Sequence, residues 1–216
     1  MKKYHYTLYL LLLLTVTDVG ADTTATGFSH DMFQEVIAEY VDDGNVNYPA
    51  INTSNSYHAY ISQLEKTTDF HSSNEELSYW INAYNALAIK GILDGRSPES
   101  FFGKIGYFYN AEYIVNGRTT NLYDLEHGVI IPLEEPRIHF ALNCASASCP
   151  KLNSAVYRAE KLETQLENAA ITFINDTTRN RFDQQTKTAY ISKIFDWFED
   201  DFVKHSGTVQ NYLALY

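Results

Sequence analysis

The sequence lacks the signatures of several common protein classes. It has no phosphate-binding glycine loop, no G-x-S-x-G nucleophile elbow and no H-E-x-x-H zinc motif. The formal net charge is −11 and no local basic patch offsets it. Nucleic acid and anionic membrane surfaces would repel such a chain, so we expect neither as a partner. The acidic balance is typical of a soluble protein, and it leaves cationic peptides or divalent ions open as ligands.

Long apolar runs are also scarce, and the clearest one lies at the N-terminus. Leu8 to Val16 follows Lys2 and Lys3, and the small residues of Val19-Gly20-Ala21 suit signal peptidase. The run is too short to favour a membrane span. We therefore expect residues 1–21 to be a secretory signal peptide. The mature protein would be exported to the periplasm or the cell exterior, with no membrane span.

Residues 22–216 are long enough for one domain with a real core, because 45% of the chain is hydrophobic. The aromatic content is biased, with 17 Tyr and 12 Phe against 2 Trp. Apolar residues at three- and four-residue spacing predict helices, and short alternating runs predict hairpins around Asn116-Gly117 and around 183–187. The expected helices cover about 28–41, 54–66, 73–94, 121–128 and 158–176, with a last one after Ser192. We predict a single α+β domain of helices packed on a small antiparallel sheet.

The helix expected from Ser73 to Asp94 has the strongest pattern. Ser73 and Glu76 have the spacing of a capping box, and a wide apolar stripe follows them. Asn82 and Asn85 lie one turn apart in its centre, although asparagine is a mediocre helix former. They are either exposed or bonded to nearby loop backbone, or one of them orients a group at a functional site.

The stretch from Arg137 to Leu152 contains both cysteines of the chain. Read as a strand, it alternates Ile138, Phe140 and Leu142 with His139, Ala141 and Asn143. Small residues at 145–148 then predict a tight loop between Cys144 and Cys149. Cys144 would lie about five residues along the strand from His139, beyond hydrogen-bond reach of the ring. Cys149 follows a loop that could fold back beside His139.

Four separated segments resemble the bacterial and plant family known as domain of unknown function 547. They are W-I-N-A-Y-N-A-L-A-I at 80–89, L-Y-D-L-E-H-G at 122–128, R-I-H-F-A-L-N-C-A-S-A-S-C-P-K-L at 137–152 and I-S-K-I-F-D-W-F-E-D-D-F at 191–202. The resemblance spans nearly all of the expected mature domain. It implies a loose likeness to papain- or transglutaminase-like cysteine hydrolases. The recurring polar positions of the family map here onto Asn82, Asn85, Glu126, His127, His139, Cys144 and Cys149.

One hypothesis is a thiol enzyme that acts on peptide-like amides as a hydrolase or acyl transferase. A thiol enzyme needs a thiolate, a nearby imidazole and a third group that fixes the imidazole. Cys149 would be the nucleophile, His139 its base and Glu126 the orienting carboxylate, with Asn82 as an alternative orienter. No cofactor is required. His139 precedes Cys149, the reverse of the papain order, so a papain-like arrangement would have a rearranged topology.

Two alternatives use the same residues. In an exported protein Cys144 and Cys149 can form a disulfide, which would leave a non-catalytic binding or scaffold domain with structural histidines. Such a disulfide could also mask a thiol until it is reduced. The second alternative is a zinc site that draws on His127, His139, the cysteines and Glu126. The four-residue gap between the cysteines is a weak match to zinc spacing.

Overall fold

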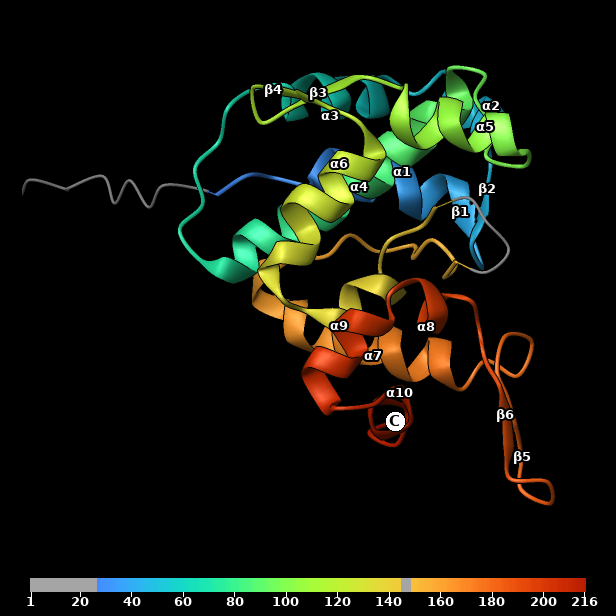
Figure 1. Cartoon of the computed structure of the whole chain (residues 1–216). Coiled ribbons are helices and arrows are strands. Elements are labelled where there is room, and N and C mark those ends of the chain that lie inside the picture. Colours follow the sequence, from blue (N-terminus) through green and yellow to red (C-terminus); the bar gives the residue numbers. More distant parts are fainter. Residues whose placement is uncertain (1–26, 145–148) are drawn as a thin grey trace, which may run out of the picture.

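The computed structural model describes residues 27–144 and 149–216, and helices dominate this part of the chain (Figure 1). The α-helices are α1 (Asp31–Tyr40), α2 (Tyr48–Ile51), α3 (Asn55–Leu64), α4 (Ser73–Leu93), α5 (Phe101–Lys104), α6 (Leu122–Leu125), α7 (Leu162–Ile174), α8 (Ile194–Trp197), α9 (Glu199–Ser206) and α10 (Val209–Leu213). The strands are β1 (Val41–Asp42), β2 (Asn45–Val46), β3 (Tyr113–Val115), β4 (Arg118–Thr120), β5 (Arg181–Asp183) and β6 (Thr188–Tyr190). Two π-helices, η1 (Ile105–Tyr109) and η2 (Glu126–Ile130), and three 3-10 helices, η3 (Ile131–Leu133), η4 (Pro136–Phe140) and η5 (Ala159–Lys161), complete the elements.

The described strands pair as three separate antiparallel hairpins, and the α+β class is confirmed. The hairpin predicted at Asn116-Gly117 is present: both residues have positive φ, 49° and 71°, as a type I′ turn requires. The second predicted hairpin forms β5 and β6, which project from the body (Figure 1). The expected signal peptide at 1–21 lies outside the described residues.

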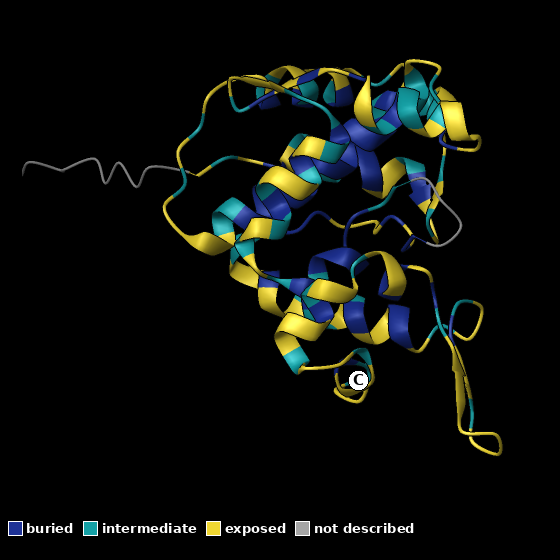
Figure 2. Cartoon of the chain, viewed as in Figure 1, coloured by how far each residue is buried: buried dark blue, intermediate teal, exposed yellow. Residues whose placement is uncertain are grey.

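Helix α4 is the longest helix in the described part of the chain, and it forms the centre of the core. Its middle is buried on every side (Figure 2), and α2, α3 and α6 pack against it. The expected capping box is wrong by one residue. Ser72 is in extended conformation and its Oγ accepts the Glu75 N–H at 3.1 Å, while the Glu75 carboxylate accepts the His71 N–H at 2.9 Å.

The strand predicted over the first part of 137–152 is wrong, because this segment contains the 3-10 helix η4. Pro136 stands in the first turn of η4, where its fixed φ favours a helix, and the Glu135 side chain accepts the Arg137 N–H at 3.0 Å. A 3-10 helix has three residues per turn, so consecutive side chains point in three directions. Ile138 enters the core around α4, Phe140 enters a second cluster, and His139 points between them.

That second cluster is aromatic and lies among α7, α8, α9 and α10. Phe140 is 5.0 Å from Phe173 and 5.8 Å from Phe202, measured between ring centroids. Phe202 is in turn 4.7 Å from Tyr212. All four rings are buried. Phe140 thus anchors the C-terminal helices to the segment that precedes the cysteines.

Two short segments complete the helical part of the fold. Residues 101–109 form α5 and η1, and Phe101 and Phe102 are 74% and 82% exposed. Residues 48–51 form α2, with Pro49 in its first turn.

The two asparagines in the middle of α4 are buried and bonded to loop backbone. Asn82 Nδ2 donates to the Tyr157 carbonyl at 2.7 Å, and its Oδ1 accepts the Tyr157 N–H at 2.9 Å. Asn85 does the same for a second segment: it donates to the Ala141 carbonyl at 3.0 Å and accepts the Asn143 N–H at 2.8 Å. Each amide satisfies backbone groups that have no regular secondary structure, which explains why asparagine stands in the middle of a helix.

Replacing Asn82 by alanine should lower the free energy of unfolding by about 2–4 kcal/mol, because the buried N–H and C=O of Tyr157 would lose their partners. Urea denaturation measures the change. Asn74→Ala on the exposed first turn of the same helix is the matched control, and it should cost less than about 0.5 kcal/mol. Equal losses for the two variants would contradict the role given to the Asn82 amide.

Candidate functional site

Five of the predicted site residues line one cavity of about 280 Å³. Glu126 and His127 come from η2, His139 comes from η4, and Cys144 and Cys149 follow η4 in the chain. Aromatic side chains form much of the remaining wall. The sequence therefore predicted the chemical groups of one concave site, although 23 residues separate Glu126 from Cys149 along the chain.

The two cysteines form a disulfide, with their α-carbons 5.9 Å apart. Cys149 is buried, whereas Cys144 is half-buried. Asn143 closes the same loop, because its Nδ2 donates to the Pro150 carbonyl at 2.9 Å. The Asn143 backbone is held in turn by Asn85. The loop base is thus fixed by one covalent bond and by hydrogen bonds to the central helix.

His139 is the most constrained polar residue of the site. Its side chain is fully buried, Phe198 stacks on the ring at 3.9 Å, and Nε2 lies 2.8 Å from Asp201 Oδ2. Burial lowers the pKa of His139, and the opposing effect of the Asp201 carboxylate is smaller. The ring is therefore neutral at neutral pH. Because a carboxylate can only accept, Nε2 carries the proton and the Nδ1 lone pair is open.

His139 Nδ1 has no hydrogen-bond partner among the described residues, although it is buried. A buried acceptor without a partner costs free energy, and such atoms are concentrated at functional positions. The His139–Asp201 pair has the form of a base held by a carboxylate. Asp201, and not the predicted Glu126, is the carboxylate that contacts the ring.

Glu126 instead accepts a hydrogen bond from the Tyr84 hydroxyl at 3.2 Å, between Oη and Oε2. Burial raises the pKa of Glu126 to about 7, the Tyr84 hydrogen bond lowers it less, and the nearby Asp201 adds to the rise. The group therefore changes protonation near neutral pH, as acid–base catalysts often do. The cavity therefore holds two groups that can exchange a proton with a ligand, the neutral His139 imidazole and the Glu126 carboxyl group.

The remaining predicted residues lie at the edge of the cavity or behind it. His127 is exposed, stacks on Tyr123 at 4.0 Å and has Nδ1 3.2 Å from the Tyr123 carbonyl. Asn82, the alternative orienter, bonds to Tyr157 rather than to His139. Asn85 and Asn143 position the loop base and are not among the residues that line the cavity.

Nothing in the described residues favours the zinc alternative. No group of three or more His, Cys, Asp or Glu side chains within 27–144 and 149–216 is arranged to hold a metal ion. The two sulfurs are bonded to each other, and a disulfide lacks the thiolate that zinc prefers.

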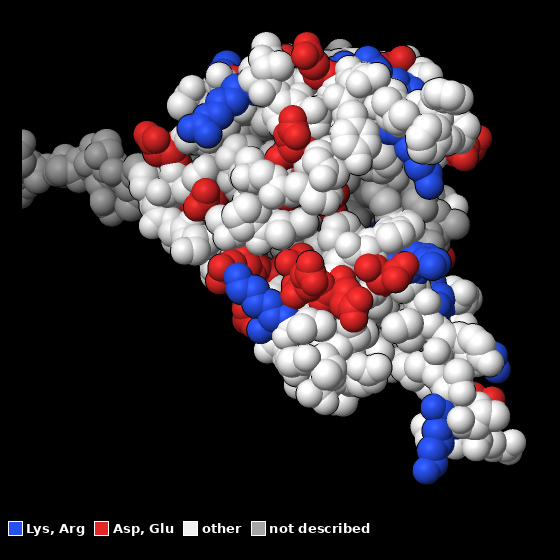
Figure 3. All heavy atoms as spheres, viewed as in Figure 1, with Lys and Arg blue, Asp and Glu red and all other residues white. Residues whose placement is uncertain are grey.

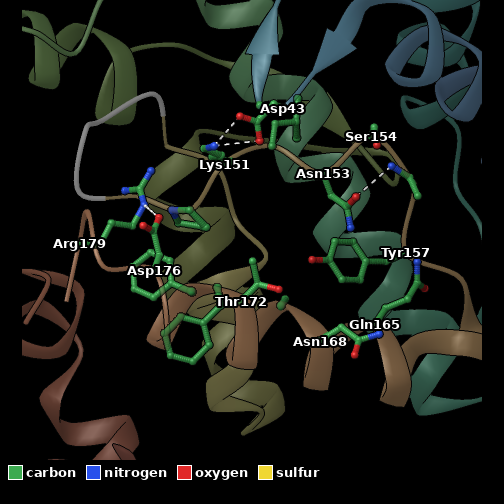
Figure 4. Close-up of a pocket in the computed structure, with 17 residues that line it drawn as sticks. Asp43, Lys151, Asn153, Ser154, Tyr157, Gln165, Asn168, Thr172, Asp176 and Arg179 are labelled. Atoms are coloured by element: carbon green, nitrogen blue, oxygen red, sulfur yellow. Dashed lines mark hydrogen bonds and ion pairs between the residues drawn. The ribbon is translucent and has the colours of Figure 1, made fainter. Parts of the chain in front are cut away.

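A second, larger cavity of about 470 Å³ is drawn in Figure 4. Phe140 and Pro150 line it, whereas their neighbours His139 and Cys149 line the first cavity. Its charged groups neutralise each other in two pairs, Asp43–Lys151 at 2.8 Å and Asp176–Arg179 at 3.1 Å, both drawn in Figure 4. None of the predicted site residues lines this cavity, so we place the candidate site in the smaller one.

Residues 68–174 match the model of a family described as "Protein of unknown function, DUF547". This match supports the resemblance drawn from the sequence. The DUF547 match contains three of the four motifs and every predicted site residue. The fourth motif, at 191–202, lies outside it and supplies Asp201 and Phe198. Neither a curated protein nor a solved structure matches the chain. No helix in the described part of the chain has the length and apolar character needed to cross a membrane.

Sequence reasoning missed Asp201 and Tyr84. Asp201 lies 62 residues beyond His139, and Asp200 beside it looks equivalent in the sequence. The one available signal was its position within the fourth motif. Tyr84 belongs to the apolar stripe of α4 and gives no sign that its hydroxyl reaches a carboxyl group.

Replacing Glu126 by glutamine should stabilise the protein at pH 8 more than at pH 5, by on the order of 2 kcal/mol. The folded protein keeps the Glu126 proton up to about pH 7, whereas the ordinary value for the unfolded chain is 4.5. Stability therefore falls as the pH rises through this window, and glutamine removes the loss. Urea denaturation at both pH values measures the difference.

Glu160→Gln provides the control, because Glu160 is exposed and has no ion pair within the described residues. This variant should change stability little at either pH. If Glu126→Gln changed the free energy of unfolding by the same amount at pH 5 and pH 8, the pKa of the Glu126 carboxyl group would not be raised in the folded protein.

Proposed function

We propose that this protein is an exported cysteine-dependent hydrolase or acyl transferase that acts on peptide-like amides, with its nucleophile stored in the Cys144–Cys149 disulfide. The observation that carries the proposal is the oriented imidazole. His139, held by Asp201 and with Nδ1 open, lines the same cavity as Cys149. The papain- or transglutaminase-like likeness is part of this proposal, in a rearranged form because His139 precedes Cys149.

Activation requires a thiol reductant. A thiolate attacks the more exposed sulfur, that of Cys144, the S–S bond breaks, and Cys149 leaves as a thiolate. A second thiol then displaces the mixed disulfide and leaves Cys144 as a free thiol. The two external thiols are oxidised to a disulfide, so two electrons enter the protein.

In the reduced protein, Cys149 attacks the carbonyl carbon of the substrate. His139 Nδ1 takes the thiol proton and returns it to the leaving amine, while Asp201 holds the ring through Nε2. The amide C–N bond breaks and a thioester forms on Cys149. Water, or an acceptor amine, then attacks the thioester and restores the thiol. Glu126 has a pKa of about 7, so it is a second group able to exchange a proton with the attacking molecule.

Reduced protein should react with iodoacetamide at pH 6 faster at Cys149 than at Cys144, by about tenfold or more, because an imidazole beside a thiol favours the thiolate. Mass spectrometry of the peptides measures the labelling of each cysteine. Asp201→Asn should reduce Cys149 labelling, whereas Asp200→Asn at the exposed neighbouring position should not. Slow and equal labelling of the two cysteines would end the enzyme proposal.

The second candidate is a non-catalytic exported binding or scaffold domain. It is favoured by the disulfide itself, because Cys149 is buried and Asn143 closes the same loop. A disulfide between cysteines this close in sequence stabilises the fold by about 2 kcal/mol, because it lowers the conformational entropy of the unfolded chain. The two candidates differ in the reduced state, since a structural disulfide gives two ordinary thiols with no dependence on His139 or Asp201.

A further inference from the structure

The cavity wall beside Glu126 is built from aromatic rings. Tyr109 and Tyr123 stack at 4.5 Å, Tyr123 stacks on His127, and Phe198 lies 6.2 Å from His127. Trp197, which also lines the cavity, is 49% exposed. These rings leave an apolar surface that an aliphatic chain can cover, and their electron-rich faces attract cations.

One carboxyl oxygen at this wall has no hydrogen-bond partner among residues 27–144 and 149–216. Glu126 Oε2 accepts from Tyr84, but Oε1 has no hydrogen bond within the described chain, and Glu126 forms no ion pair with a described lysine or arginine. The residue is half-buried and lines the cavity. A carboxylate that is partly withdrawn from water gains most from a ligand that brings a positive charge and a donor together.

Acidic residues follow part of the cavity wall in the sequence. Trp197 and Phe198 line the cavity and belong to the sequence D-W-F-E-D-D, and acidic side chains gather over α8 and α9 in Figure 3. Glu199 and Asp200 are exposed and form no ion pair among the described residues. Lys104 is an exposed cation that lines the cavity. The acidic surface that follows Trp197 and Phe198 favours the approach of a cation.

From these features we infer that the cavity selects substrates that carry a primary ammonium group on an aliphatic stem, as a lysine side chain does. The stem covers the aromatic wall and the ammonium donates to Glu126 Oε1. The amide carbonyl of the same substrate would then face the His139 and Cys149 end of the cavity. The inference names a substrate class for the proposed function, but the binding step needs neither a free thiol nor turnover.

Binding to the oxidised full-length protein tests this directly. The probes are Nα-acetyl-lysine methylamide and the norleucine analogue, which keeps the stem and lacks the ammonium. Titrations followed by NMR at pH 8, where Glu126 is ionised, should give the lysine probe an affinity about tenfold higher or more. Glu126→Gln should abolish this preference. Glu199→Gln, at an exposed position outside the cavity lining, should keep most of it.

Equal affinity for the two probes, or a preference that survives in Glu126→Gln, would overturn the inference. The thermal melt of Glu126→Gln shows whether the variant is folded, and retained norleucine binding shows that its cavity is intact. If the two cysteines are labelled equally but the lysine probe still binds more tightly than the norleucine probe, only the enzyme proposal is rejected. Selective labelling of Cys149 without a lysine preference would reject only the substrate class.

Discussion

The candidate site depends on two side-chain amides in the middle of one buried helix. Asn82 and Asn85 each give one donor and one acceptor to backbone that lacks regular secondary structure. Without them, buried backbone groups at Tyr157 and Ala141 would lose these partners, each at a cost of about 1–3 kcal/mol. The helix is therefore both the core of the domain and the support of the segment that carries His139 and the cysteines. Loops that bear functional groups are precise when a rigid element holds them in this way.

The short 3-10 helix η4 joins that support to the rest of the molecule. Because its consecutive side chains point in three directions, Ile138 packs with α4, Phe140 packs with the C-terminal helices, and His139 faces the cavity. The two hydrophobic clusters therefore fix the imidazole from both sides. The same division places His139 and Cys149 on one cavity and Phe140 and Pro150 on the other.

Burial then sets the chemistry of the two titratable groups. It keeps the His139 ring neutral in spite of Asp201, and it keeps Glu126 protonated up to about neutral pH. A neutral base and a weak acid in one cavity are compatible with proton transfer, and the carboxyl group is ready to ionise when a cation replaces its lost hydration. The disulfide adds a redox condition, because its sulfurs cannot act as nucleophiles until the S–S bond is reduced.

The sequence by itself determined the class of fold, most helices, the Asn116-Gly117 hairpin and the five chemical groups that line the cavity. Local patterns suffice for these, since helix periodicity, turn residues and motif composition depend on near neighbours. Tertiary structure decided the rest. The alternation at 138–142 suggested a strand, but Pro136 and packing on both sides made a 3-10 helix. Asp201 became the partner of His139, and Tyr84 that of Glu126, because chain folding brings together residues that are 62 and 42 positions apart, and no local pattern encodes such contacts.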